Sequence, residues 1–529
     1  MKILITDGLA EQGLEILKAA KSLKITEKKG ITKEELLEII KDYDGLVVRS
    51  ATKVTKEVIE ASSGNLKVIG RAGIGVDNID VEAATRNGII VMNTPESNAI
   101  TTAEHTITLL FSLARNVPQA HMSIKSGKWE RNKYEGIELY GKTVGFIGLG
   151  NIGKLVAERV IGLKMKAVAY DPYLSEKAAN KIGVTLVSLE ELLKEADVIT
   201  VHTPLTPETK NLINKETIDK MKDGVIIINC ARGGIINEHD IAEAIKSRKV
   251  AGAAFDVYTT EPIDQSNPLL AINENIVLTP HLGASTEEAQ IKVGTAMAEQ
   301  IVQFAVDGVV RNAVNMPSLT MQQLKQMKPY LNLAEALGSL QGQLCKSAVN
   351  EIEINYEGIV SESKTDSLTI AVLKGFLTPI MDIVVTYVNA PVIAKERNIK
   401  VTESKSSESG AYTSLITVNL KTSDGEYKVS GTIFGKEEVR IVRVNEVPID
   451  VIPQGFLLVS ENADKPGFIG AMCTILGKNG INIGLMHLGR KVIGGRAIVF
   501  TSVDTVVPKD VIDEIYELED TISLTQVSF

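Results

Sequence analysis

Residues 142–171 read KTVGFIGLGNIGKLVAERVIGLKMKAVAYD, and they decide the fold of the domain around them. An apolar strand expected over residues 143–147 leads into Gly148-x-Gly150-x-x-Gly153, which an amphipathic helix and a second strand follow. Gly148 permits the tight turn, Gly150 lets a pyrophosphate approach the backbone, and Gly153 lets helix and strand pack closely. The N–H groups that open this helix face the phosphates, where the helix dipole favours negative charge. This pattern predicts a dinucleotide-binding domain.

Asp171 closes the second strand, roughly 20 residues after the glycines, which is the usual spacing for the ribose-binding acid. A carboxylate at this place accepts hydrogen bonds from the adenosine ribose, and it would repel a phosphate attached to that ribose. We therefore expect NAD rather than NADP as the cofactor. A glycine pattern alone is weak, but the strand, helix and acid around it favour the cofactor-binding interpretation over an ordinary glycine-rich loop.

Length and composition favour a soluble protein of several domains. The chain has 529 residues, for which about three or four domains is the natural expectation. The formal net charge is −9 and no basic tract is present, so nucleic acid is not expected as a partner. No apolar run reaches the ~18 residues that a membrane span needs. The N-terminus does not read as a signal peptide, and three widely spaced cysteines form neither a disulfide framework nor a metal site, so we expect a cytoplasmic protein without a metal.

Residues 2–92 alternate short apolar strands with helical patterns, which predicts an α/β domain with a mostly parallel sheet. Two of these strands end in arginine, at Arg49 and Arg71, and Arg71 is followed by Gly73-Ile74-Gly75. Open α/β sheets bind ligands at the carboxyl ends of their strands, and guanidinium groups suit phosphate and carboxylate. One such arginine would be read as a surface ion pair, whereas two at neighbouring strand ends favour an anion site. Asn98 stands at the start of the long helix that leads into the next domain.

Three further side chains stand where later strands end: Arg232 in CARGG, Glu261 in YTTEP and His281 in TPHLGAS. An imidazole base can take the proton of a hydroxyl group while hydride leaves the same carbon. A carboxylate beside it fixes the tautomer, and an arginine can grip a substrate carboxylate and polarise the nascent carbonyl. Taken singly, His281 reads equally well as a core or capping histidine and Glu261 as a loop acid. Next to a cofactor domain, the set predicts oxidation of a 2-hydroxy acid by hydride transfer.

Of the remaining histidines, His121 and His239 are expected at the surface, and His105 and His487 are expected to pack within their elements. His202, just before Thr203, is expected to line the cofactor cleft without acting as the base, and Cys230 to be a buried strand-end thiol rather than a nucleophile. The pattern changes after Ser318, where a helical start, a helical pair and alternating strands extend to residue 450. Residues 451–529 read strand, helix, strand, strand, helix, strand, the split βαβ pattern. We expect a discontinuous substrate domain (1–97 and 283–317), an inserted NAD domain (98–282), an intervening domain (318–450) and a regulatory domain (451–529).

Six runs stand out along the chain: RSATKVT, GRAGIGVDNID, GLGNIGKLVA, NCARGGIIN, AAFDVYTTEP and PHLGASTEEAQ. They resemble the D-isomer-specific 2-hydroxyacid dehydrogenase family, in its long form, over essentially the whole chain. The resemblance implies a Rossmann-type NAD domain inserted in a flavodoxin-like α/β substrate domain, then an α+β intervening domain and a C-terminal ACT (βαββαβ) domain. It also implies NAD-dependent oxidation of 3-phosphoglycerate to 3-phosphohydroxypyruvate, the first step of L-serine biosynthesis, by a homo-oligomer (a dimer or tetramer).

By position, the resemblance implies roles for individual residues. His281 is the acid/base, Glu261 its partner and Arg232 the arginine that binds the substrate carboxylate. The expected substrate-binding residues are Arg49, Arg71, Gly73, Asn98, Arg232 and His281. The expected NAD-site residues are Gly148, Gly150, Asn151, Ile152, Gly153, Asp171, Thr203, Pro204, Cys230, Ala231, Arg232, Asp256, His281, Gly283 and Ala284. Asp464 and Asn482 match positions that contact serine as an effector, although this chain has Asn462 where one common form of that turn has histidine.

Two other interpretations stay open. Another D-2-hydroxyacid dehydrogenase, for a glycerate-like substrate, would share the fold, but shorter relatives of that kind generally lack an ACT domain. A non-catalytic scaffold that senses NAD would also share the fold, and the intact set of Arg232, Glu261 and His281 does not exclude it. Turnover with 3-phosphoglycerate separates these interpretations.

Overall fold

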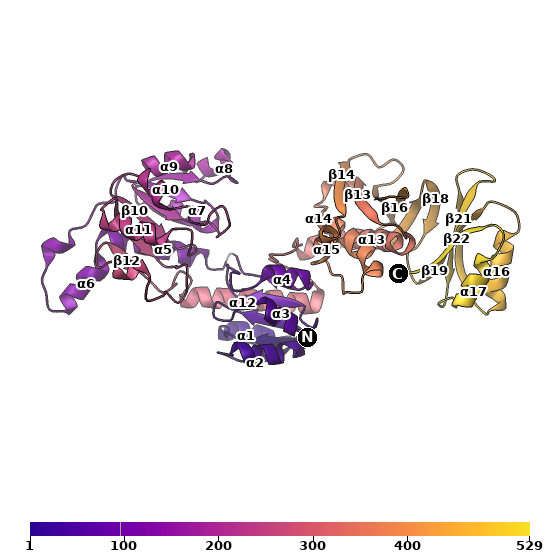
Figure 1. The fold of residues 1–529 in the computed structure, drawn as a ribbon, viewed down its shortest axis with the longest axis horizontal. Coiled ribbons are helices and arrows are strands. Elements are labelled where there is room, and N and C mark those ends of the chain that lie inside the picture. Colours follow the sequence, from indigo (N-terminus) through magenta and orange to yellow (C-terminus); the bar gives the residue numbers. More distant parts are fainter. Residues whose placement is uncertain (96) are drawn as a thin grey trace.

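The computed structural model describes residues 1–95 and 97–529 of the chain. Four β-sheets follow one another along an elongated molecule. In Figure 1 a seven-stranded sheet lies at one end, a five-stranded sheet occupies the middle, and sheets of six and four strands extend to the other end. No helix among the described residues is long and apolar enough to cross a membrane.

The five-stranded sheet is parallel and has the order β2-β1-β3-β4-β5, which is the flavodoxin-like order that the fold prediction named. Helices cover both faces because the strands are apolar on both sides. The strands are β1 (Lys2–Ile5), β2 (Lys24–Glu27), β3 (Gly45–Val48), β4 (Val68–Arg71) and β5 (Ile90–Met92). The helices are α1 (Glu11–Ala19), α2 (Lys33–Ile39), α3 (Lys56–Ala61), α4 (Val81–Arg86) and, much later in the chain, α12 (Glu287–Asp307).

Helix α12 belongs to the core of this sheet although it follows the seven-stranded sheet in sequence. Its Val293, Met297 and Ile301 pack against the apolar side chains of β1, β3 and β4. It also lies close to α1, where a Cβ on Gly13 would fall 2.7 Å from the carbonyl oxygen of Gly294. The chain therefore leaves this unit after β5 and returns to it with α12, so the seven-stranded sheet is an insertion. The residue boundaries assigned to the domains stay a prediction.

The seven-stranded sheet is also parallel, in the order β12-β11-β10-β9-β6-β7-β8. The strand order reverses beside β6, and a crevice at such a switch point is where doubly wound sheets bind dinucleotides. The strands are β6 (Thr143–Ile147), β7 (Lys166–Tyr170), β8 (Thr185–Leu186), β9 (Val198–Val201), β10 (Val225–Asn229), β11 (Val250–Phe255) and β12 (Ile276–Leu278). The helices are α5 (Ala99–Ala114), α6 (Val117–Lys125), α7 (Asn151–Gly162), α8 (Glu176–Asn180), α9 (Leu189–Glu195), α10 (Lys215–Asp219) and α11 (Glu238–Lys246).

The six-stranded sheet has the order β14-β13-β15-β16-β17-β18, with only the β13–β14 pair parallel. Helices α13 and α14 pack on its apolar face and form one core with it. The elements are α13 (Met321–Leu344), β13 (Val349–Gly358), α14 (Asp366–Leu377), α15 (Ala390–Glu396), β14 (Lys400–Ser406), β15 (Ser414–Thr422), β16 (Glu426–Phe434), β17 (Glu438–Val444) and β18 (Val447–Val451).

The last sheet is antiparallel, in the order β20-β21-β19-β22, and carries two helices on one face. This is the βαββαβ arrangement that the sequence predicted. Its other face, with Leu457, Val459 and Phe500, joins the core of the six-stranded sheet. The elements are β19 (Phe456–Ala463), α16 (Phe468–Lys478), β20 (Ile483–Arg490), β21 (Arg496–Val503), α17 (Lys509–Tyr516) and β22 (Thr521–Ser528).

Candidate active site

The three glycines after β6 differ in what surrounds them. Gly148 has φ of 90°, and a Cβ there would lie 2.7 Å from the carbonyl oxygen of His202. A Cβ on Gly153 would lie 2.6 Å from the carbonyl oxygen of Gly148, so α7 packs tightly on the turn. Around Gly150 no described atom lies within 4 Å of that position. The open backbone at Gly150, beside the N-terminus of α7, therefore fits a pyrophosphate.

Asp171 stands directly after β7, beside the glycine turn. Its carboxylate accepts hydrogen bonds from the backbone N–H groups of Leu149 and Tyr173, each at 2.9 Å. These two bonds fix the side chain at the rim of the crevice, where it is half-buried. A fixed negative charge in this place suits a ribose with two free hydroxyl groups better than one that carries a phosphate.

The other predicted cofactor residues follow the neighbouring strands. Thr203 and Pro204 come after β9, and the hydroxyl oxygen of Thr203 is buried without a partner among the described residues. Cys230 and Ala231 come after β10 and are buried. Burial raises the pKa of the Cys230 thiol to about 12, so the group stays neutral and is not a nucleophile. The rest of the predicted set lies at the start of α7 (Asn151, Ile152) and in the turn after β12 (Gly283, Ala284).

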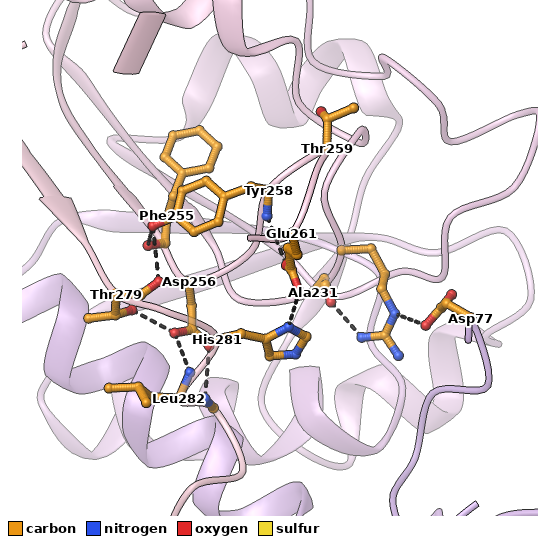
Figure 2. A network of polar contacts seen from close by, with 12 residues as sticks. Asp77, Ala231, Phe255, Asp256, Tyr258, Thr259, Glu261, Thr279, His281 and Leu282 are labelled. Carbon is orange, nitrogen blue, oxygen red and sulfur yellow. Dashed lines mark hydrogen bonds and ion pairs between the residues drawn. The ribbon is translucent and has the colours of Figure 1, made fainter. Parts of the chain in front are cut away.

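His281 and Glu261 form a hydrogen-bonded pair, which Figure 2 shows. The Nδ1 atom of His281 lies 2.7 Å from Oε2 of Glu261, and Oε1 of Glu261 accepts a hydrogen bond from the backbone N–H of Tyr258 at 3.0 Å. The hydrogen bond that Glu261 accepts from His281 raises the pKa of His281 above its ordinary value. Burial works to raise the pKa of Glu261, but its bonds to His281 and Tyr258 outweigh burial and lower it. The carboxylate is therefore charged and directs the Nδ1 proton to itself, which leaves Nε2 free to act as a base.

Asp256 holds the backbone on which His281 stands. Its side chain is 1% exposed and accepts hydrogen bonds from Thr279 Oγ1 at 2.6 Å, Leu282 N at 2.7 Å and Gly283 N at 2.8 Å. Burial works to raise the pKa of Asp256, but hydrogen bonds, first that of His105, lower it overall. His281 has φ of 56°, a left-handed conformation that non-glycine residues rarely adopt, and this anchored turn imposes it.

Arg232 reaches from the turn after β10 toward the five-stranded sheet. Its Nε donates to Oδ2 of Asp77 at 2.7 Å, and its Nη1 donates to the carbonyl oxygen of Ala231 at 2.6 Å. The positive charge of Arg232 also works to lower the pKa of His281, against the effect of Glu261. The guanidinium of Arg232 lies where the turns of the two sheets adjoin.

A cleft of about 600 Å³ lies between the units that carry these residues. The residues that line it include Arg49, Lys53, Arg71, Gly73, Asn98, Glu261 and His281. Burial lowers the pKa of Arg71 to about 10, with the positive charges of Arg232 and Arg49 acting in the same direction. The Nε atom of Arg71 and Oδ1 of Asn98 are buried and have no partner among the described residues. Unpaired buried polar groups beside several cations fit a binding site for an anion.

Four residues that support this site were absent from the sequence prediction. Asp77 pairs with Arg232, and Asp7 accepts hydrogen bonds from the backbone of Arg49 and Thr52. Lys53 adds a cation to the cleft, and His105, expected only to pack within its helix, lies 3.2 Å from Asp256. Lys53 had a signal in the sequence, four residues after Arg49 in the same strand-end run. The other three act through residues far away along the chain.

The two residues expected to contact serine lie in the last domain, far along the chain from this cleft. Asp464 follows β19 and accepts hydrogen bonds from Arg490 Nη1 at 2.5 Å and Gly494 N at 2.9 Å. Asn482 precedes β20 and donates to Asp504 at 2.8 Å. Both side chains therefore hold turns of the domain, and their contact with an effector stays a prediction.

Comparisons with known proteins cover most of the chain. The model of the D-isomer specific 2-hydroxyacid dehydrogenase NAD binding domain matches residues 107–283. The D-3-phosphoglycerate dehydrogenase intervening domain matches residues 326–445, and the ACT domain matches residues 456–520. These matches agree with three of the four units that the structure shows.

Full-length relatives are also similar. D-3-phosphoglycerate dehydrogenase of Methanocaldococcus jannaschii is 47% identical over 98% of both chains, and that of Archaeoglobus fulgidus is 44% identical over 100% of both. Among solved structures, the D-lactate dehydrogenase of Aquifex aeolicus complexed with NAD and lactic acid matches with a TM-score of 0.53 and 28% identity. That match covers 59% of this chain and 100% of the other.

Proposed function

The chain belongs to the D-3-phosphoglycerate dehydrogenase family, and we propose that Arg232, Glu261 and His281 carry out its NAD-dependent oxidation of 3-phosphoglycerate. The protein is an NAD-dependent oxidoreductase, and the product of the reaction is 3-phosphohydroxypyruvate. The observation that supports the residue roles best is the pair of His281 and Glu261, at 2.7 Å, on the wall of a cleft lined by arginines.

The crevice beside β6 fits the cofactor. The uncovered backbone at Gly150 would hold the pyrophosphate of the cofactor, and the anchored carboxylate of Asp171 would hold its ribose. The buried hydroxyl group of Thr203, which has no partner among the described residues, would hold a group next to the pyrophosphate. NAD supplies the hydride acceptor when it is bound, and the similar D-lactate dehydrogenase of Aquifex aeolicus forms a complex with NAD. A carboxylate at residue 171 favours NAD over NADP.

His281 is the proposed general base. Its Nε2 takes the proton of the C2 hydroxyl group of the substrate, while the hydride leaves the same carbon and a carbonyl group forms. The imidazolium that results is stabilised by the charged Glu261, at 2.7 Å from Nδ1. Oxidation needs the neutral imidazole. Because the pKa of His281 is raised, the rate of oxidation should increase as pH rises through that raised pKa, and the reverse reduction should decrease over the same range.

The arginines are the proposed recognition elements for a substrate with two acidic ends. Arg232 would bind the carboxylate next to the reacting carbon, because a guanidinium can hold a carboxylate with two hydrogen bonds and this one reaches from the seven-stranded sheet to the turn that follows Arg71. Arg49 and Arg71, together with Gly73 and Asn98, line the cleft that His281 also lines, and would bind the rest of the substrate. A cluster of three arginines favours a substrate that carries a phosphate in addition to a carboxylate. This favours phosphoglycerate over a glycerate-like acid.

The direct test is the formation of NADH from NAD when the purified protein is mixed with 3-phosphoglycerate, D-glycerate or D-lactate. We expect turnover mainly with 3-phosphoglycerate. A preference for glycerate would support the other dehydrogenase interpretation, and NAD binding without turnover would support the scaffold.

His281→Ala should lower kcat by roughly 10²–10⁴-fold while NAD affinity stays near that of the wild type. Full activity of that variant at neutral pH would show that another group is the base.

Effector binding and assembly are further parts of the proposal. Serine is the proposed effector of the ACT domain, with Asp464 and Asn482 as contacts. A homo-oligomer, dimer or tetramer, is supported by apolar side chains that the segment around α6 exposes: Val117, Met122, Ile124, Trp129 and Tyr140, with Trp129 84% exposed. Light scattering after size-exclusion chromatography would measure the molar mass and so distinguish a monomer, a dimer and a tetramer. The three free cysteines suit the proposed cytoplasmic location, which cell fractionation would test.

A further inference from the structure

Asp77 and Arg232 join the two units that form the cleft. Asp77 lies in the turn between β4 and α4 of the five-stranded sheet, whereas Arg232 follows β10 of the seven-stranded sheet. Their 2.7 Å contact, between Oδ2 and Nε, connects residues 155 positions apart in the chain. We propose that Asp77 is a positioning residue, which crosses the cleft to set the guanidinium of Arg232 for the substrate carboxylate. This inference rests on the substrate-binding role proposed for Arg232.

The turn that carries Asp77 lies directly against this guanidinium, at Gly75. A Cβ on Gly75 would lie 1.8 Å from Nη2 of Arg232 and 2.8 Å from Oδ2 of Asp77. Gly75 has no positive φ, so the need for glycine here is one of space rather than of backbone conformation. The guanidinium of Arg232 therefore lies directly against this turn. Because the side chain of Asp77 is 63% exposed and that of Arg232 28% exposed, the role proposed for the pair is to orient the arginine rather than to stabilise the fold.

Hydrogen bonds hold the backbone around both Asp77 and Arg232. On the side of Asp77, the side chain of Asn93 donates a hydrogen bond to the carbonyl oxygen of Ile74 at 2.6 Å. The side chain of Asn78 donates to the carbonyl oxygens of Arg49 and Thr52, each at 2.7 Å. The Asp77 turn is thus tied directly to the Arg49 turn.

On the side of Arg232, the buried Asn229 donates from its side chain to the carbonyl oxygen of Arg232 at 2.9 Å and accepts from Ala231 N at 3.0 Å. Since each turn is hydrogen-bonded within its own domain, the ion pair depends on how the two domains are placed.

The hydrogen bonds of Arg232 leave one edge of the guanidinium for a ligand. Asp77 takes the Nε proton and Ala231 takes one proton of Nη1. The remaining N–H groups are on the two terminal nitrogens, and these can bind a carboxylate as a fork. Without Asp77, the guanidinium would have Arg71 as a charged neighbour, and like charges repel. Asp77 therefore supplies orientation and also offsets part of this repulsion before the substrate arrives.

The test compares Asp77→Ala and Asp77→Asn with the wild type and with Glu82→Gln. Glu82 is an exposed acid of the same domain that pairs with Arg86 on α4, so its replacement makes the same change of charge away from the cleft. We expect Asp77→Ala to raise KM for 3-phosphoglycerate by about tenfold and lower kcat by a few-fold, the order of a charge-assisted hydrogen bond. The KM for NAD and the melting temperature should stay at their wild-type values. Asp77→Asn keeps an oxygen that can accept a hydrogen bond from Nε. Its KM for 3-phosphoglycerate should therefore lie between those of the wild type and of Asp77→Ala.

A double-variant cycle separates this inference from the role of Arg232. If Asp77 acts through Arg232, then Asp77→Ala should cause little further loss of kcat/KM in a chain that already carries Arg232→Ala. If Arg232→Ala alone leaves kcat/KM unchanged, the proposed role of Arg232 fails. If Arg232→Ala is impaired but Asp77→Ala behaves like Glu82→Gln, only the positioning role is overturned. A lower KM for 3-phosphoglycerate in Asp77→Ala would overturn it too, since Asp77 would then compete with the substrate.

Discussion

Glu261→Gln tests the geometry of the proposed base, because it removes one charge without changing the size of the side chain. The two carboxylate oxygens of Glu261 serve two donors, the Nδ1–H of His281 and the backbone N–H of Tyr258. A glutamine has only one oxygen, so it can serve only one of them, and its NH₂ group then faces the other. If NH₂ faces Nδ1, the ring proton moves to Nε2, where the base is needed.

The structure indicates the size of the effect. A hydrogen bond to a charged group contributes about 1.5–3 kcal/mol. The side chains of His281 and Glu261 are 46% and 37% exposed, so solvent screening favours the lower end, which is about tenfold in rate. The donor left without an acceptor contributes another factor of about ten. We therefore expect kcat for phosphoglycerate oxidation to fall about 10²-fold at a pH where the wild type is fully active. This lies at the low end of the range for a general base.

The variant should also shift the pH dependence. Glu261 raises the pKa of His281, so its replacement lowers that pKa. The rate of oxidation should then begin to increase at a lower pH than in the wild type. Its maximum should still be the lower kcat expected above. The assay is initial NADH formation over a pH series at saturating NAD and 3-phosphoglycerate, with Glu243→Gln as control, since this exposed acid pairs with Lys246 on α11. A wild-type kcat and pH profile for Glu261→Gln would refute the assignment of the pair.

Three further predictions concern the cofactor and the effector. Gly153→Ala should destabilise the fold, because its Cβ would lie 2.6 Å from the carbonyl oxygen of Gly148, whereas Gly150→Ala should keep its melting temperature but bind NAD more weakly. Equal melting temperatures for the two would contradict this distinction. Asp171→Ala should raise kcat/KM with NADP relative to NAD, and an unchanged ratio would remove Asp171 from the ribose site. Asp464→Ala should blunt inhibition by serine without changing turnover in its absence; a normal serine dose response would exclude this contact.

The sequence predicted the parts of this site that depend on neighbouring residues. The turn at Gly148, Gly150 and Gly153 is local, because the backbone conformation and the space around each glycine follow from one strand–turn–helix unit. Neighbouring residues also predicted that Arg71 ends an apolar strand and that His281 follows one. Parallel strands end on one edge of a sheet, so the position of each residue at the ligand-binding edge of its own sheet followed from the fold class.

Only the tertiary structure decided how these groups are held. Asp77 pairs with Arg232 across 155 positions, and His105 lies beside Asp256 from a different element. Such contacts depend on how two sheets and their turns are placed, and the patterns along the sequence carry periodicity and backbone conformation but no distances between domains. The sequence by itself determined which chemical groups this protein has and at which strand ends they stand. The tertiary structure decided which of them touch, because a hydrogen bond forms only when packing brings its donor and acceptor to about 3 Å.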